Sequence, residues 1–190
     1  MVRILFFLNI AGFWAQLFYG EFLIYWFALW PIGPEGGPSF IPWQLISYSF
    51  LHGGILHLGV NMLALWMFGR DVERVLGSRR FLLYYLVCVV SAALLQLLVA
   101  FASAAPYPTV GASGGVFGLL LAYGLFFPHR RLLLLFPPIP MPAWLFVSLY
   151  AALELVLGVT GTQAGVAHFA HLGGMLGGYL VLQLGRRRPR

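Results

Sequence analysis

The chain has 190 residues, of which 61% are hydrophobic and only 8% are charged, and its mean hydropathy is +0.90. This composition excludes an ordinary soluble domain and is typical of a polytopic membrane protein, whose membrane-embedded part must carry any chemistry. All eleven basic residues are arginines in short clusters between or beyond apolar segments, so the net charge of +6 indicates membrane topology and not a nucleic-acid partner. The one cysteine, Cys88, excludes an intramolecular disulfide.

The apolar segments predict an all-α polytopic membrane protein, with a single membrane domain over residues 1–190. Its six approximate spans are 4–19, 53–69, 81–101, 113–127, 144–157 and 166–184. The first is interpreted as a retained span and not as a cleaved signal peptide, because it lacks a convincing small-residue cleavage site and more spans follow it. Gly20 and Glu21 are expected to end this span, and the aromatic stretch 22–30 to form a long interfacial outer loop. The proline-rich stretch 137–142 is expected at the membrane surface.

The arginines sort by position along the chain. Arg3 precedes the first span, and the clusters 70–80, 130–131 and 186–190 follow the second, fourth and sixth spans. The positive-inside rule therefore predicts that both termini and the two basic loops are cytoplasmic. The second, fourth and sixth spans then all begin at the outer face. Polar residues lie at these three starts, in the order His57 and Asn61, Ser113, and His168 with His171.

The most informative segment is 111–118, which places Ser113 among four glycines at the head of an apolar run. A serine nucleophile needs an adjacent base, a site for the oxyanion and room for another backbone to approach. Helix packing is the alternative, because Gly114 and Gly118 form a GxxxG pattern. The fourth span covers only roughly 22 Å of a hydrocarbon core of about 30 Å. Ser113 should therefore start below the outer surface, with the preceding loop buried in protein or lining a wet cavity.

The polar residues at the outer helix ends are most simply explained together. Any one histidine in a membrane helix is more often a packing residue with its hydrogen bonds satisfied. His57 and Asn61 are four residues apart and share one helix face. Three distant segments that bring a serine, an asparagine and histidines to one depth favour a catalytic site over independent packing roles.

The motifs resemble the rhomboid family of intramembrane serine proteases. They are His52-x4-His57-x3-Asn61, Gly111-x-Ser113-Gly114 and Ala170-His171-Leu172-x-Gly174, in six spans with an aromatic first outer loop. The resemblance implies Ser113 as nucleophile and His171 as general base, a dyad without an acidic third member. It also implies an oxyanion site made by the Ser113 backbone N–H and the side chains of His57 and Asn61, with His52 mainly structural. Many relatives have tyrosine where this chain has Phe117, which can still stack on His171 but lacks the hydroxyl.

Helix geometry favours His171 over His168 as the base without the resemblance. On a helix, His171 shares a stripe with the small residues Ala164, Ala167, Gly174 and Gly178, and the fourth span offers the complementary small residues Gly111, Gly114, Gly118 and Ala122. Close packing of these surfaces would bring His171 within hydrogen-bond reach of Ser113. His168 instead shares its face with larger residues, so it is expected to line the water entrance or to bond a loop carbonyl.

The predicted function is proteolysis of transmembrane protein substrates near the outer face of a prokaryotic inner membrane, without a cofactor, a metal or nucleic acid. Two alternatives remain. One is a non-catalytic rhomboid-like protein that binds membrane clients, which typically lacks the serine or the histidine. The other is a histidine-rich metal site, which is disfavoured because there is no HExxH motif and no outer-face carboxylate close to the histidines in sequence. Glu154, near the outer end of the fifth span, is given no role.

Overall fold

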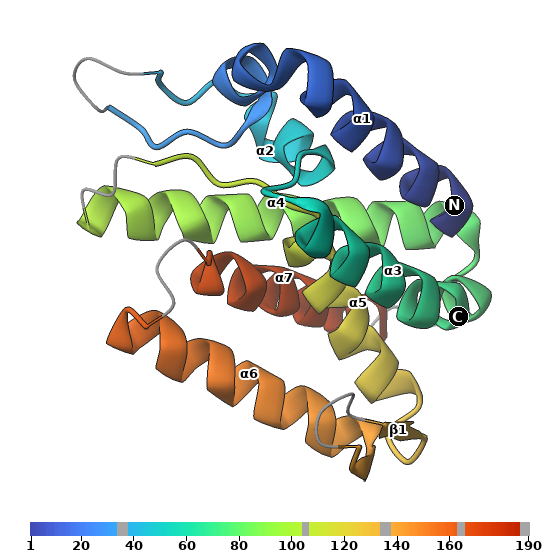
Figure 1. The fold of residues 1–190 in the computed structure, drawn as a ribbon. Coiled ribbons are helices and arrows are strands. Elements are labelled where there is room, and N and C mark those ends of the chain that lie inside the picture. The colour runs from blue at the N-terminus through green and yellow to red at the C-terminus, as the bar shows by residue number, and fades with distance from the viewer. Residues whose placement is uncertain (34–37, 104–106, 134–137, 163–165, 187–190) are drawn as a thin grey trace.

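The computed structural model describes residues 1–33, 38–103, 107–133, 138–162 and 166–186. This part of the chain is a bundle of helices with one short antiparallel hairpin (Figure 1). The helices are α1 (Val2–Phe27), α2 (Gln44–Ser47), the 3₁₀ turn η1 (Tyr48–Phe50), α3 (Ile55–Leu76), α4 (Ser78–Ser103), α5 (Ser113–Phe126), α6 (Ala143–Thr160) and α7 (His168–Arg186). The strands are β1 (Arg131–Leu133) and β2 (Pro140–Pro142).

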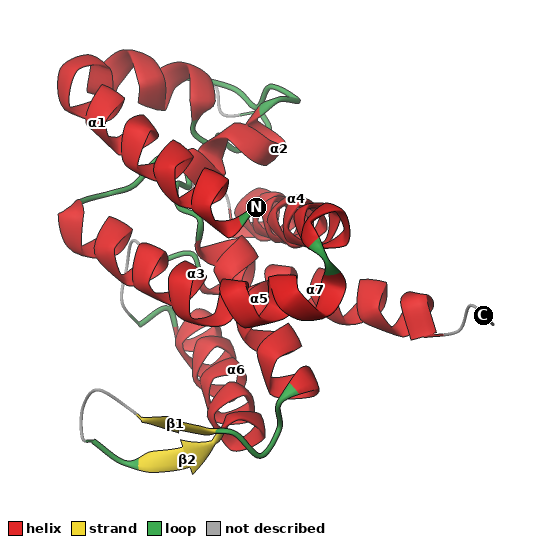
Figure 2. Cartoon of the chain, turned by 90° about the vertical axis from the view of Figure 1, so that its right-hand side faces the viewer, coloured by secondary structure: helices red, strands yellow, loops and turns green. Residues whose placement is uncertain are grey.

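The centre of the bundle is formed by α4, α5 and α7, which pack closely on one another. On one side α3 packs against α5 and carries α1 on its outer face, and on the other side α6 packs against α5 and α7 (Figures 1 and 2). The short α5 is buried along most of its length, including Gly114, Leu119 and Ala122. Ser113 therefore begins a helix that is surrounded by protein.

The exterior of the bundle is apolar, as expected for a protein in a lipid bilayer. Large apolar side chains are exposed along α1, α3, α4, α6 and α7, among them Phe7, Phe18 and Val159, and a soluble monomer rarely exposes so many. In the part of the chain that the structure describes, three helices are long and apolar enough to cross a membrane, namely α1, α4 and α6. The pair formed by α2 with η1 and α3 passes the same test as one span bent by 100°. The structure is thus that of a polytopic membrane protein.

The first helix is longer than the sequence predicts. Gly20 and Glu21 do not end it, and α1 continues through them to Phe27, so most of the aromatic stretch 22–30 is helical. Only Tyr19 leaves helical geometry, with φ −126° and ψ 32°, and the two parts of α1 meet there at a kink. Since Glu21 is exposed, no charge has to be buried for the helix to continue in the new direction.

The basic stretch 70–80 is also more helical than a loop. It is divided between the end of α3 and the start of α4, with Gly77 alone between them at a φ of +76° that favours glycine. At this end of the bundle Asp71 pairs with Arg74, at 2.5 Å, and with Arg130 from beyond the end of α5. The stretch expected at the membrane surface contains β2, which pairs with β1.

Helices α5 and α7 approach closely because glycine lies at their contact. A Cβ added to Gly174 would overlap the backbone carbonyl of Gly114, and one added to Gly118 would overlap the sulfur of Cys88 on α4. This is the contact that the small-residue stripe predicts. Gly178 departs from it, because it faces Tyr84 and Cys88 of α4 and not α5. Ala164, the first member of the stripe, lies outside the described residues.

The segment that leads into α5 is held inside the protein by backbone hydrogen bonds. Leu29 and Thr109 exchange both N–H···O bonds, at 3.0 and 2.9 Å, and the Gly111 N–H donates to the carbonyl of Tyr48 at 3.0 Å. The Tyr48 hydroxyl donates in turn to the carbonyl of Val89 on α4, at 2.9 Å. Gly111 and Ala112 are buried. The two residues directly before Ser113 are therefore buried, as expected, whereas Tyr107, earlier in the same segment, is exposed.

Candidate active site

Ser113 is the first residue of α5, and the backbone before it turns sharply at Gly111, whose φ of +130° is a conformation that side chains rarely allow. The first hydrogen bond of the helix runs from the Val116 N–H to the carbonyl of Ala112. The N–H groups ahead of Val116, including that of Ser113, have no helical acceptor because a helix has none to offer its first turn. They give the Ser113 end of α5 a positive partial charge that favours an anion.

His171, in the first turns of α7, faces Ser113 from the neighbouring helix. Its Nε2 lies 2.8 Å from the Ser113 Oγ, a normal hydrogen-bond distance. Phe117, one turn along α5 from Ser113, stacks on the imidazole with ring centroids 4.2 Å apart and planes within 4° of parallel. The stacking expected for Phe117 is present, and it fixes the plane in which His171 meets the serine.

Glu154 joins the site from α6, which sequence reasoning missed. Its Oε2 lies 2.9 Å from Nδ1 of His171 and 2.6 Å from Nδ1 of His168, and all three residues are buried. His168 therefore bonds a carboxylate, where the sequence predicts a water entrance or a loop carbonyl. Glu154 is 14 and 17 residues from these histidines in sequence, so their closeness in space could not be read from the spacing of the residues. The sequence did contain one signal for this role, because a carboxylate within an apolar span usually has a partner or a function.

His57 lies on the other side of the serine. Its Nδ1 accepts a bond from the Gly53 N–H at 3.3 Å, and its Cε1 and Nε2 would both lie 2.8 Å from a Cβ built on Gly111. The same Cβ position is 3.6 Å from the Ser113 Oγ, so the Nε2 edge of His57 is directed at the serine end of α5. The absence of a side chain at Gly111 leaves room for this imidazole.

Asn61 and His52 are buried near His57. The Asn61 side-chain amide donates one N–H to the carbonyl of His57 at 2.9 Å, within its own helix. The His52 ring lies 5.2 Å from that of His57, and its backbone exchanges two bonds with the side chain of Gln16 on α1, at 2.7 and 3.2 Å. Gln16 thus fastens α1 to the turn before α3, a contact that the sequence did not indicate.

The sequence of this chain matches the rhomboid domain family model over residues 40–188, a region that contains every one of these side chains except Gln16. The chain belongs to the rhomboid family. The resemblance seen in the motifs is therefore confirmed.

Three curated relatives illustrate how far the similarity extends. The rhomboid-family chain is 34% identical to the mitochondrial Rhomboid protein 1 of Saccharomyces cerevisiae over 72% of its own length and 40% of that protein. It is 33% identical to the rhomboid protease GluP of Bacillus subtilis over 73% of its length and 25% of that protein. RHOMBOID-like protein 4 of Arabidopsis thaliana is 34% identical over 73% of the chain and 33% of the relative. The chain thus spans well under half of each relative.

Among the described residues of this rhomboid-family chain, Glu154, His168 and His171 also form a group that could hold a metal ion. Each offers one ligand atom, and the three atoms lie within 4.8 Å of one another. Two histidines and a glutamate are a set known from catalytic zinc sites. However, both Nδ1 to Oε2 distances are those of hydrogen bonds, which require a proton where a metal would need a lone pair.

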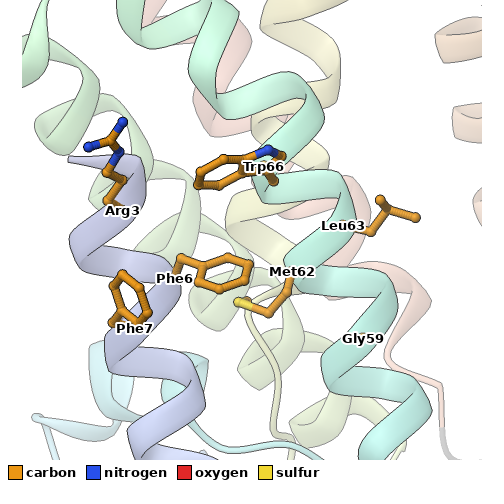
Figure 3. Close-up of a pocket in the computed structure, with 7 residues that line it drawn as sticks. All are labelled: Arg3, Phe6, Phe7, Gly59, Met62, Leu63 and Trp66. Carbon is orange, nitrogen blue, oxygen red and sulfur yellow. The ribbon is translucent and has the colours of Figure 1, made fainter.

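A groove of about 680 Å³ lies elsewhere on this rhomboid-family chain, between α1 and α3 (Figure 3). Its lining residues are Arg3, Phe6, Phe7, Gly59, Met62, Leu63 and Trp66. Neither Ser113 nor His171 contributes to it, and its walls are mainly apolar. The groove is thus separate from the Ser113 site.

Proposed function

We propose that this rhomboid-family chain is an intramembrane serine endopeptidase in which Ser113 is the nucleophile and His171 the general base. The observation that carries the proposal is the 2.8 Å contact between His171 Nε2 and Ser113 Oγ, inside a helical bundle with an apolar exterior. A serine hydroxyl is a weak nucleophile until an adjacent base takes its proton. The pair is thus suited to attack a peptide carbonyl in a substrate that reaches the site within the membrane.

In the proposed reaction, His171 Nε2 takes the hydroxyl proton as Ser113 Oγ bonds to the carbonyl carbon. The protonated His171 then gives this proton to the leaving amine nitrogen, and the C–N bond breaks. Water hydrolyses the acyl-enzyme in a second cycle of the same proton transfers. The negative charge on the carbonyl oxygen is to be held by the Ser113 N–H at the start of α5, with His57 and Asn61 as side-chain donors.

The proposed topology has six spans, with both termini in the cytoplasm and the active site open to the outer aqueous phase of a prokaryotic inner membrane. It is supported by the placement of the basic segments. Toward the right of Figure 1 lie the start of α1, the end of α3 and strand β1, which follows α5. Arg130, just before β1, forms an ion pair with Asp71 at the end of α3. Ser113, His57 and His171 are at the opposite ends of their helices. The proposed substrates are transmembrane proteins whose helices unwind near the outer face, because an intact helix shields its own peptide bonds.

Covalent labelling tests the proposal directly. A fluorophosphonate added to the purified protein in detergent should form one adduct, which mass spectrometry of peptides should locate on Ser113. The same preparation in liposomes should cleave a transmembrane reporter substrate. An adduct on another residue, or a folded protein that binds the reporter without either reaction, would contradict the protease and support a client-binding role.

Replacing the side-chain donors of the oxyanion site should slow turnover without preventing adduct formation. His57→Ala and Asn61→Ala each remove at most one donor, for which a loss of about 10²–10³ in kcat is typical. The kcat for the reporter and the yield of the Ser113 adduct would be measured in parallel. Unchanged kcat in both variants would remove these two residues from the site.

Chelators should leave the protease activity unchanged, because the proposed mechanism has no metal in it. The companion experiment adds zinc. An ion bound to Glu154, His168 and His171 would occupy Nδ1 of His171 and leave a proton on its Nε2, and a protonated Nε2 cannot take the proton of Ser113. Zinc is therefore expected to inhibit. Complete inactivation by EDTA or phenanthroline, reversed by zinc, would instead support a metal-dependent hydrolase.

A further inference from the structure

We propose that Glu154 is a positioning residue for His171, so that the chain works with a Ser113–His171–Glu154 series in place of a serine–histidine pair alone. The inference rests on the proposed function, and it concerns a residue on α6 to which the family resemblance gives no role. Nδ1 of His171 lies 2.9 Å from Glu154 Oε2, while Nε2 of the same ring lies 2.8 Å from Ser113 Oγ. One imidazole thus connects a buried carboxylate to the serine.

The carboxylate decides which nitrogen of His171 carries the proton. A neutral imidazole has one N–H donor and one acceptor nitrogen, and an ionised carboxylate can only accept. Nδ1 of His171 must therefore carry the hydrogen that faces Glu154. Nε2 is then left with its lone pair toward the Ser113 hydroxyl, which is the form a general base needs.

His168 makes this arrangement possible by sharing the carboxylate. Its Nδ1 lies 2.6 Å from the same Oε2, and its side chain is only 5% exposed. A buried carboxylate is costly unless hydrogen bonds satisfy it. With donors from both histidines, Glu154 can stay ionised beside His171, and it is held in one orientation between α6 and α7.

The charge of Glu154 has its effect when the proton moves. As His171 Nε2 takes the proton of Ser113, the imidazole gains a positive charge, and the Nδ1–H to Oε2 bond becomes a bond between opposite charges. The proton on Nδ1 stays there, and no proton is transferred to Glu154. When His171 gives up the Nε2 proton to the leaving amine, the original neutral pair returns. Glu154 therefore stabilises the charged intermediate without touching the substrate.

The test is Glu154→Gln, which keeps the size of the side chain and removes the charge. Its amide can donate as well as accept, so the hydrogen on His171 Nδ1 is no longer required. We expect kcat for a transmembrane reporter to fall by about 10²–10⁴ while KM is essentially unchanged. Glu154→Asp, which restores the carboxylate, should recover part of the loss. Glu21→Gln is the matched control, because it makes the same charge change at an exposed site on α1 and should leave kcat unaltered.

Nitrogen-15 NMR of histidine-labelled protein in detergent measures which ring nitrogen of His171 carries the proton. A purely structural role of Glu154 would not change this. In the unsubstituted protein His171 should carry its proton on Nδ1, and in Glu154→Gln this form should lose population. The His171 signals are identified by their loss in His171→Ala. The proposal is overturned if Glu154→Gln keeps full kcat, or if His171 is found protonated on Nε2 in the unsubstituted protein.

The outcomes separate this proposal from the protease itself. If Ser113→Ala still cleaves the reporter, the proposed function fails whatever Glu154 does. If Ser113→Ala is inactive and Glu154→Gln is fully active, the protease stands and the positioning role alone is rejected. A fall in kcat that is matched by an equal fall in the folded fraction would also reject it in favour of a purely structural contact between α6 and α7.

Discussion

Ser113→Ala is expected to abolish proteolysis and adduct formation while leaving a folded protein. In a well-characterised serine protease, loss of the nucleophile lowers kcat by about 10⁶-fold, so no product should be detectable above background. The cost in stability should be small, on the order of 1 kcal/mol, because the substitution removes one hydrogen bond from a residue that is only partly buried. Cleavage of a transmembrane reporter and the thermal midpoint in detergent would be measured on the same preparation.

The matched control for this variant is a serine elsewhere in the membrane part of the chain. Ser148 on α6 is exposed, and its hydroxyl donates to the carbonyl of Trp144 within its own helix at 2.9 Å. Ser148→Ala should therefore be fully active and labelled as the parent protein is. Residual cleavage by Ser113→Ala at more than a trace would show that another group is the nucleophile.

The second large effect is expected at His171 and not at its neighbour His168. His171→Ala removes the group 2.8 Å from Ser113 Oγ, and the loss should again be about 10⁶-fold. His168→Ala removes only a partner of Glu154, an indirect change of about 1–2 kcal/mol or about 5–30-fold, so a measurable part of the activity should remain. Initial rates of reporter cleavage and of fluorophosphonate labelling distinguish the two variants.

Both variants must be compared in folded protein, because each leaves Glu154 with one donor fewer. Circular dichroism and gel filtration in detergent provide that check. The opposite pattern, an active His171→Ala and an inactive His168→Ala, would assign the base to His168. It would also contradict the contact between His171 and Ser113 on which the proposed mechanism depends.

The contact of Ser113 with His171 could be predicted because it follows from periodicity alone. Small residues at helical spacing permit two backbones to approach, and the histidine in that stripe then has only one neighbour of matching shape. Gly174 against Gly114 is that approach, and Phe117, four residues after the serine, falls on the same face of α5 as Ser113. Contacts that follow from the pattern of residues along a helix face can therefore be predicted from the sequence.

Glu154 could not be placed in the same way. Its contact with His171 depends on how α6 is rotated about its axis and on how far it is shifted along α7, and neither quantity is fixed by the pattern of an almost uniformly apolar helix. The predicted end of α1 was wrong for a different reason. Gly20 and Glu21 are breaking signals in a soluble helix, but in α1 they lie beside a kink at Tyr19 and are not required to pack.

The close packing of Cys88 against Gly118 gives the protein a built-in reporter of its own core. Cys88 is the one cysteine of the chain and is fully buried on α4. Gly118 of α5 and Gly178 of α7 lack the side chain that would displace its sulfur. A thiol reagent can reach it only when α4, α5 and α7 separate. The rate at which a maleimide modifies Cys88 therefore measures how often the helices that carry Ser113 and His171 come apart, with no engineered label. Movements of α1 at the edge of the bundle would leave that rate unchanged.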